Sequence, residues 1–148
     1  MIEQLIPLIN KTAINEVQKE LTHLYEIELF ERQTYSIQIE RFEGLILEVL
    51  KDVSEQEEHH ANILKKILNK VGIIVIDEYD KIPLKKATGQ LKEALEYDIK
   101  QEEISAKDYQ KTISIVKDEN LKTVLEHILS EEFSHLGILE KYLETGKY

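Results

Sequence analysis

The chain has 148 residues, which is the size of one domain with a single hydrophobic core, and we expect one domain over residues 1–148. It has no cysteine, which excludes disulfides, cysteine-ligated zinc, iron–sulfur clusters and thiol catalysis. Its formal net charge is -10, and 32% of its residues are charged. Nucleic acid and anionic membrane surfaces attract clustered positive charge, so the composition argues against both as partners.

The chain also lacks the signals of a membrane or secreted protein. It contains no stretch of about 18 uncharged apolar residues that could cross a bilayer. Its first ten residues, MIEQLIPLIN, carry an acid and no basic residue, unlike the start of a signal peptide. We therefore expect a cytoplasmic protein.

Four segments of the chain show the periodicity of amphipathic helices. Apolar residues recur at three- and four-residue spacing over residues 12–42, 45–71, 90–116 and 119–143, and Gly44, Gly72, Gly89 and Gly146 mark their ends. Residues 72–89 form a longer connection with an apolar IIVI run, for which no pairing strand is evident. This order predicts an all-α antiparallel four-helix bundle with a long crossover between the second and third helices.

Polar residues interrupt each apolar stripe near its middle. In chain order they are Glu28, Glu31 and Tyr35; Glu57 and His60; Asp98, Glu102, Ser105 and Tyr109; and Glu132 and His135. An unpaired carboxylate costs several kcal/mol to bury, and neighbouring carboxylates repel one another. Two divalent cations would neutralise four of them beside two neutral imidazoles. Because the donors include no sulfur, they suit iron or manganese better than copper or structural zinc.

The interruptions form an internal repeat. Glu28-x6-Tyr35 recurs as Glu102-x6-Tyr109 after 74 residues, and Glu57-x-x-His60 recurs as Glu132-x-x-His135 after 75 residues. The one-residue difference falls where the turn at Gly44 is expected. Glu20-x-x-His23 is a third copy of the second motif, without a counterpart. The repeat predicts a metal site built from two copies of a helical hairpin.

This pattern resembles the ferritin-like carboxylate-bridged di-iron proteins, and most closely the di-iron domain of rubrerythrins, over residues 21–143. The resemblance implies that Glu57 and Glu132 bridge two metal ions. It assigns Glu28 and His60 to one ion and Glu102 and His135 to the other. Tyr35 and Tyr109 would donate hydrogen bonds to carboxylates across the bundle.

The chain departs from the rubrerythrin pattern at one ligand position. Rubrerythrins usually carry a further ligating glutamate one turn after the glutamate of the third helix, where this chain has Ser105. Glu31 stands at the corresponding position of the first helix and is a candidate extra ligand. The far nitrogens of His60 and His135 need hydrogen-bond acceptors that the sequence does not identify.

The resemblance also implies a function. It indicates a di-iron oxidoreductase that holds two iron ions, with manganese or zinc as alternatives, and reduces hydrogen peroxide or dioxygen. Without cysteine there is no rubredoxin-like iron site, so electrons would come from an external donor protein. A ferritin-like ferrous iron oxidase and a non-catalytic metal-binding bundle stay open. We expect a homodimer, the commonest symmetric oligomer.

Several polar residues near the stripes are expected not to bind metal. His59 and His127 lie beside inward positions and are interpreted as surface residues. His23 is interpreted as a non-ligand. Asp98, one turn before Glu102, is expected to lie at the polar edge of its helix.

Overall fold

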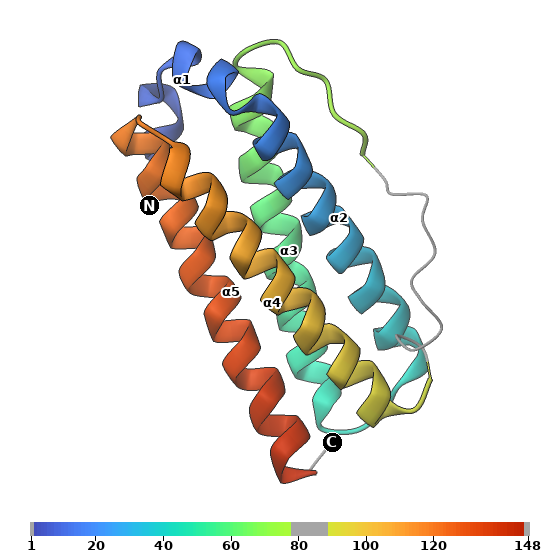
Figure 1. Ribbon diagram of the computed structural model, residues 1–148. Coiled ribbons are helices and arrows are strands. Elements are labelled where there is room, and N and C mark those ends of the chain that lie inside the picture. The colour runs from blue at the N-terminus through green and yellow to red at the C-terminus, as the bar shows by residue number, and fades with distance from the viewer. Residues whose placement is uncertain (1, 78–88, 147–148) are drawn as a thin grey trace.

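The computed structural model describes residues 2–77 and 89–146 (Figure 1). A 3-10 helix, η1 (Ile2–Leu8), and a short helix, α1 (Lys11–Glu16), precede four long helices, α2 (Gln18–Arg41), α3 (Ile46–Asn69), α4 (Leu91–Ile115) and α5 (Glu119–Thr145). Helices α2 and α3 form one antiparallel pair, and α4 and α5 form the other. Helix α3 ends and α4 begins at opposite ends of the bundle (Figure 1). The predicted all-α bundle with a long crossover is confirmed.

The helix boundaries agree with the sequence except in the first segment. Helices α3, α4 and α5 begin and end within two residues of the predicted ranges. The prediction of one continuous helix over residues 12–42 is wrong, because the backbone leaves the helical conformation at Val17, with φ -124° and ψ 22°. The Val17 N–H donates to the carbonyl of Ile14 instead of one residue further back. The side chain of Val17 is buried, and the chain before it leaves the axis of α2 and packs on α5 at the end of the bundle (Figure 1).

The N-terminal segment closes one end of the bundle, although the sequence suggested no element for it. The Lys70 ammonium, just beyond α3, donates to the carbonyl oxygens of Ile6, Pro7 and Ile9. The Asp118 carboxylate caps α5 and also accepts from the backbone N–H of Asn10, which itself begins α1. These contacts join both helical pairs to the N-terminal segment.

The connection after α3 begins with a turn at Gly72, whose φ of 78° lies in the left-handed region that favours glycine. The apolar run at residues 73–76 then has no regular secondary structure. It is fastened to the bundle by the Tyr25 hydroxyl, which donates to the carbonyl of Ile76. The rest of the predicted crossover, residues 78–88, lies outside the described residues.

The bundle core consists of two apolar layers with a polar band between them. One layer, near η1, is built from residues that include Leu21, Leu24, Leu64, Leu68, Leu121, Leu125 and Ile128. The other, near the turn between α2 and α3, is built from Tyr35, Ile46, Leu50, Val53, Leu95 and Leu139. On every long helix the interrupting polar residues lie between these layers, so the apolar side chains seal the band from both ends. Within the described part of the chain, no helix is long and apolar enough to cross a membrane.

Candidate metal centre

The four long helices bring all six predicted ligands into the polar band. Each side chain comes from the inward face of its helix, and none is more than 2% exposed. The residues are Glu28 on α2, Glu57 and His60 on α3, Glu102 on α4, and Glu132 and His135 on α5. In an E-x-x-H pair the two side chains lie about one helical turn apart on the same face, so both reach the centre of the bundle.

Two overlapping sets of four residues have the geometry of metal sites. The first contains Glu28, Glu57, His60 and Glu132, and the second contains Glu57, Glu102, Glu132 and His135. In each set, one candidate ligand atom per residue lies within 4.8 Å of the others. Glu57 and Glu132 belong to both sets. The geometry therefore provides two adjacent positions with two shared carboxylates.

Both imidazoles direct the same ring nitrogen at these carboxylates. The Nδ1 atom of His60 lies 3.0 Å from Oε1 of Glu132 and 3.4 Å from Oε2 of Glu28. The Nδ1 atom of His135 lies 3.0 Å from Oε1 of Glu57. The two rings stack with their centroids 6.0 Å apart. Nδ1 is thus the candidate ligand atom of each histidine.

The tyrosines lie where the sequence predicted, across the bundle from their carboxylates. The Tyr35 hydroxyl donates to Oε1 of Glu102, and the Tyr109 hydroxyl donates to Oε1 of Glu28, each at 2.7 Å. Burial raises the pKa of both phenols well above the ordinary value, and the neighbouring carboxylates raise it further. Both tyrosines therefore stay protonated and donate. Each occupies one oxygen of its glutamate.

The remaining candidate ligand atoms make no hydrogen bond of normal geometry with the described residues, although Nδ1 of His135 and Oε1 of Glu57 lie 3.0 Å apart. They are both oxygens of Glu57, the Oε2 atoms of Glu28, Glu102 and Glu132, and Nδ1 of His135. Buried polar atoms are rarely left unpaired unless an ion or another unseen partner satisfies them. The donors are oxygen and nitrogen atoms only. This set fits two divalent cations.

The electrostatics of the cluster also favours bound cations. Burial, followed by repulsion from the other carboxylates, raises the pKa of Glu57 and Glu102 well above the ordinary value and that of Glu132 to about 7. Burial lowers the pKa of His60, but Glu28, Glu131 and Glu132 raise it well above the ordinary value. Without cations, protons must neutralise part of this cluster. Cations that bind would displace those protons.

Glu31 and Ser105 are also buried beside the cluster. Glu31 is only 3% exposed, and neither of its oxygens has a hydrogen-bond partner within residues 2–77 and 89–146. Burial raises the pKa of Glu31 well above the ordinary value, and Glu102 raises it further. Glu31 belongs to neither set of four, so its role as an extra ligand stays a prediction. The Ser105 hydroxyl is buried, has no hydrogen-bond partner in the described part of the chain and carries no charge.

The structure identifies the acceptors for the far nitrogens of the histidines. The Nε2 atom of His60 pairs with Oε1 of Glu131 at 3.4 Å, and that of His135 pairs with Oε1 of Gln56. Each partner is the residue immediately before a shared glutamate of the opposite helix. The two residues occupy equivalent positions of the repeat, 75 residues apart. Equivalence alone does not mark a hydrogen-bond partner, and neither residue interrupts an apolar stripe.

The expectation that Asp98 lies at a polar edge is wrong. Asp98 is 1% exposed, and its Oδ1 atom accepts a hydrogen bond from the Gln38 side-chain amide at 2.8 Å. Burial raises its pKa well above the ordinary value. The amide of Gln38 on α2 gives Asp98 a partner inside the bundle, which periodicity along α4 alone does not reveal.

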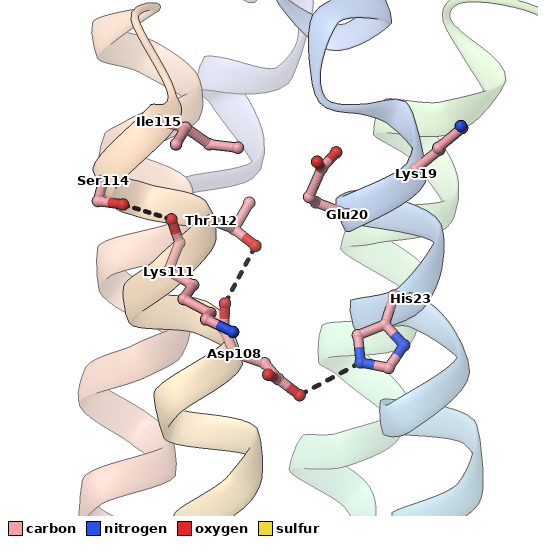
Figure 2. A pocket seen from close by; sticks show the side chains of 8 residues that line it. All are labelled: Lys19, Glu20, His23, Asp108, Lys111, Thr112, Ser114 and Ile115. Carbon is pink, nitrogen blue, oxygen red and sulfur yellow. Dashed lines mark hydrogen bonds and ion pairs between the residues drawn. The ribbon is translucent and has the colours of Figure 1, made fainter.

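The other histidines lie outside the cluster, as expected. The side chains of His59 and His127 are 52% and 47% exposed and pair with Glu3 and Glu131. His23 is 60% exposed and pairs with Asp108 at 3.2 Å across a groove between α2 and α4. Figure 2 shows this pair, with the Glu20 carboxylate pointing away from His23. The third E-x-x-H copy therefore forms no metal site with its own glutamate.

Comparison with protein families decides the classification. The family model for rubrerythrin matches residues 19–143, which cover both hairpins and every residue of the cluster. The chain belongs to the rubrerythrin family. Among curated proteins, a search found none that matches it. Like other rubrerythrins, it combines a ferritin-like bundle with a buried carboxylate and imidazole cluster that could hold metal.

Proposed function

We propose that this rubrerythrin-family protein is a di-iron oxidoreductase that reduces hydrogen peroxide, or dioxygen, with electrons from an external donor protein. One observation carries the proposal: two sets of four buried ligands share Glu57 and Glu132. A two-electron reduction suits two metal ions held side by side. The homodimer expected above stays part of the proposal, and sedimentation analysis would test it.

The charge of the ligand set supports divalent ions. Glu28, Glu57, Glu102 and Glu132 together contribute four negative charges when ionised, and neutral His60 and His135 contribute none. Two divalent ions balance this charge, whereas a single ion leaves two buried charges uncompensated. Carboxylate and imidazole ligands without sulfur suit iron or manganese. We assign iron on the family membership.

When bound, two ferrous ions supply one electron each, which is the number that cleavage of peroxide to two water molecules requires, together with two protons. The chain positions and shields this chemistry. Tyr35 and Tyr109 fix one oxygen of Glu102 and Glu28, so the other oxygen faces the cluster. The two apolar layers exclude bulk water from both ends of the band. The charged ligands therefore act in a medium of low polarity, where their hold on a cation is strong.

A ferrous iron oxidase is the second candidate, and one observation favours it. A cavity of about 110 Å³ between α2 and α4 has Glu26 and the buried Glu31 in its lining. Glu31 interacts with the cluster glutamates as well as lining this cavity, and carboxylates in such a position suit a cation that is itself the substrate. In that case each chain would oxidise more ferrous ions than the two that it binds.

Metal content tests the shared basis of both candidates. We would measure iron per chain in the wild type and in the double variant Glu57→Ala, Glu132→Ala after anaerobic loading with ferrous ion. The matched control is Glu55→Ala, Glu126→Ala, which removes exposed carboxylates from the same two helices. We expect about two ions in the wild type and control, and fewer than about half an ion in the double variant. Circular dichroism would verify that all three are folded.

Turnover assays then separate the candidates. Ferrous protein that consumes one peroxide per two irons, and repeats this with an artificial electron donor, supports the peroxidase. Oxidation of many added ferrous ions per chain by dioxygen supports the iron oxidase instead. Metal binding without either reaction would indicate a non-catalytic metal-binding protein. Iron content that is the same in the double variant and the wild type would exclude the site itself.

A further inference from the structure

The far nitrogens of the two candidate histidine ligands meet chemically different partners. His60 on α3 faces the carboxylate of Glu131 on α5, at 3.4 Å. His135 on α5 faces the amide of Gln56 on α3. The two partners occupy equivalent positions in the internal repeat. The two copies of the repeat therefore have the same candidate ligands but different hydrogen-bond partners for the far nitrogens of the histidines.

The two partners constrain their histidines differently. An ionised carboxylate can only accept, so Glu131 requires a proton on Nε2 of His60 and leaves the lone pair on Nδ1, toward the cluster. A glutamine side chain both accepts and donates, so Gln56 is compatible with either tautomer of His135 when its amide turns over. Glu131 thus restricts His60 to the tautomer whose Nδ1 atom can bind metal. Gln56 is compatible with that tautomer of His135 but does not require it.

The Glu131 carboxylate contacts two histidines through one oxygen, since its Oε1 atom pairs with Nε2 of His60. Oε1 of Glu131 also lies 3.0 Å from Nε2 of His127, one turn earlier on α5. The carboxylate is about a quarter exposed, at 27%, so it reaches water as well as the buried ring. The Gln56 amide, which pairs with Nε2 of His135, carries no charge.

We propose that Glu131 is a positioning residue that strengthens metal binding at the His60 position, and that Gln56 supports the His135 position less strongly. A carboxylate that accepts the Nε2 proton makes the imidazole a better electron donor than an amide does. The two metal positions are therefore chemically inequivalent despite their matching ligands. This inference rests on the metal site of the proposed function.

The test measures cobalt(II) affinity at fixed pH, one position at a time. His135→Ala retains the His60 position, and His60→Ala retains the His135 position. Cobalt(II) absorption with a competing chelator gives the dissociation constant in each background. Glu131→Gln should weaken binding about tenfold or more in the His135→Ala background and leave it unchanged in the His60→Ala background. Gln56→Glu should strengthen binding in the His60→Ala background only.

A second readout distinguishes ligand tuning from a general structural effect. In cobalt-loaded protein the Nε2 proton of a bound histidine gives a strongly shifted, exchangeable NMR signal. Glu131→Gln should move the His60 signal or broaden it through faster exchange, and leave the His135 signal in place. The exchanged double variant Gln56→Glu, Glu131→Gln should reverse the two patterns.

Two outcomes overturn the inference in different ways. Equal effects of Glu131→Gln in both backgrounds, or none, would show that Glu131 does not tune one position, while the metal site itself stands. Wild-type protein that binds no cobalt(II) would overturn the site and this inference together. Folding of each variant is verified by circular dichroism before titration.

Discussion

The Tyr35 hydroxyl and the Glu102 carboxylate meet across the bundle, with 2.7 Å between Oη and Oε1. They come from α2 and α4, which belong to different helical pairs. The second copy of the motif makes the reciprocal contact, from Tyr109 on α4 to Glu28 on α2. These two hydrogen bonds join the two hairpins at the level of the cluster. They also determine which carboxylate oxygen is left for a cation.

Removal of either phenol hydroxyl should weaken metal binding. Tyr35→Phe frees Glu102 from its donor, so we expect the affinity for divalent ions to fall by about tenfold, and Tyr109→Phe should act alike through Glu28. Competition with a chelator would measure this. Tyr25→Phe is the matched control, because its hydroxyl donates to the carbonyl of Ile76, away from the cluster. An equal loss in the control would contradict the role of the tyrosines.

The metal-free protein should lose stability as the pH rises. Glu57, Glu102 and Glu132 have raised pKa values, and that of Glu132 is about 7 against an ordinary value of 4.5. Above pH 4.5 the unfolded chain releases these protons while the folded chain keeps them, so the free energy of unfolding falls as pH rises through about 7. The raised pKa of His60 acts in the same direction.

Thermal unfolding of the metal-free protein measures this dependence. The Tm should fall between about pH 5 and about pH 8, and Glu132→Gln should flatten the slope. Divalent metal should raise the Tm most at the high end of the range, where it no longer competes with protons. A metal-free Tm that rises steadily over this range would contradict the proposed protonation of the cluster.

The variant Glu31→Gln tests whether Glu31 is only a buried acid or also a metal ligand. The variant removes a carboxyl with a raised pKa, so the metal-free protein should gain stability at neutral pH. If Glu31 binds metal, affinity should fall by about tenfold, a loss of about 1.4 kcal/mol in binding free energy. Glu26→Gln makes the same change at a less buried position of the same helix. Unchanged metal affinity in Glu31→Gln would remove Glu31 from the candidate ligands.

Leu64→Ala should destabilise the fold without changing the ligands. Leu64 is fully buried in the apolar layer near η1, one turn beyond His60. Truncation leaves a cavity, so the free energy of unfolding should fall by about 2–5 kcal/mol. Urea unfolding of the metal-free protein would measure it. The metal stoichiometry of the folded variant should stay at the wild-type value. A lower stoichiometry would mean that metal binding depends on the packing of this apolar layer.

The sequence by itself determined the helical class, three of the four long helices to within two residues, and the six candidate ligands. Helical periodicity is a local property, and a polar residue in an apolar stripe is conspicuous because burial makes it costly. The repeat of Glu28 to Tyr35 and of Glu57 to His60 then distinguished these residues from isolated motifs such as the one at Glu20 and His23. Local patterns of this kind do not depend on knowing which helices meet.

Tertiary structure decided what local patterns cannot contain. The break at Val17 accompanies packing of the N-terminal segment on α5, and the buried Asp98 has its partner, Gln38, on another helix. Glu131 and Gln56 gained their roles only when α3 and α5 placed each beside the histidine of the opposite helix. Hydrogen bonds between residues more than 70 positions apart depend on helix packing, which no spacing along one helix encodes.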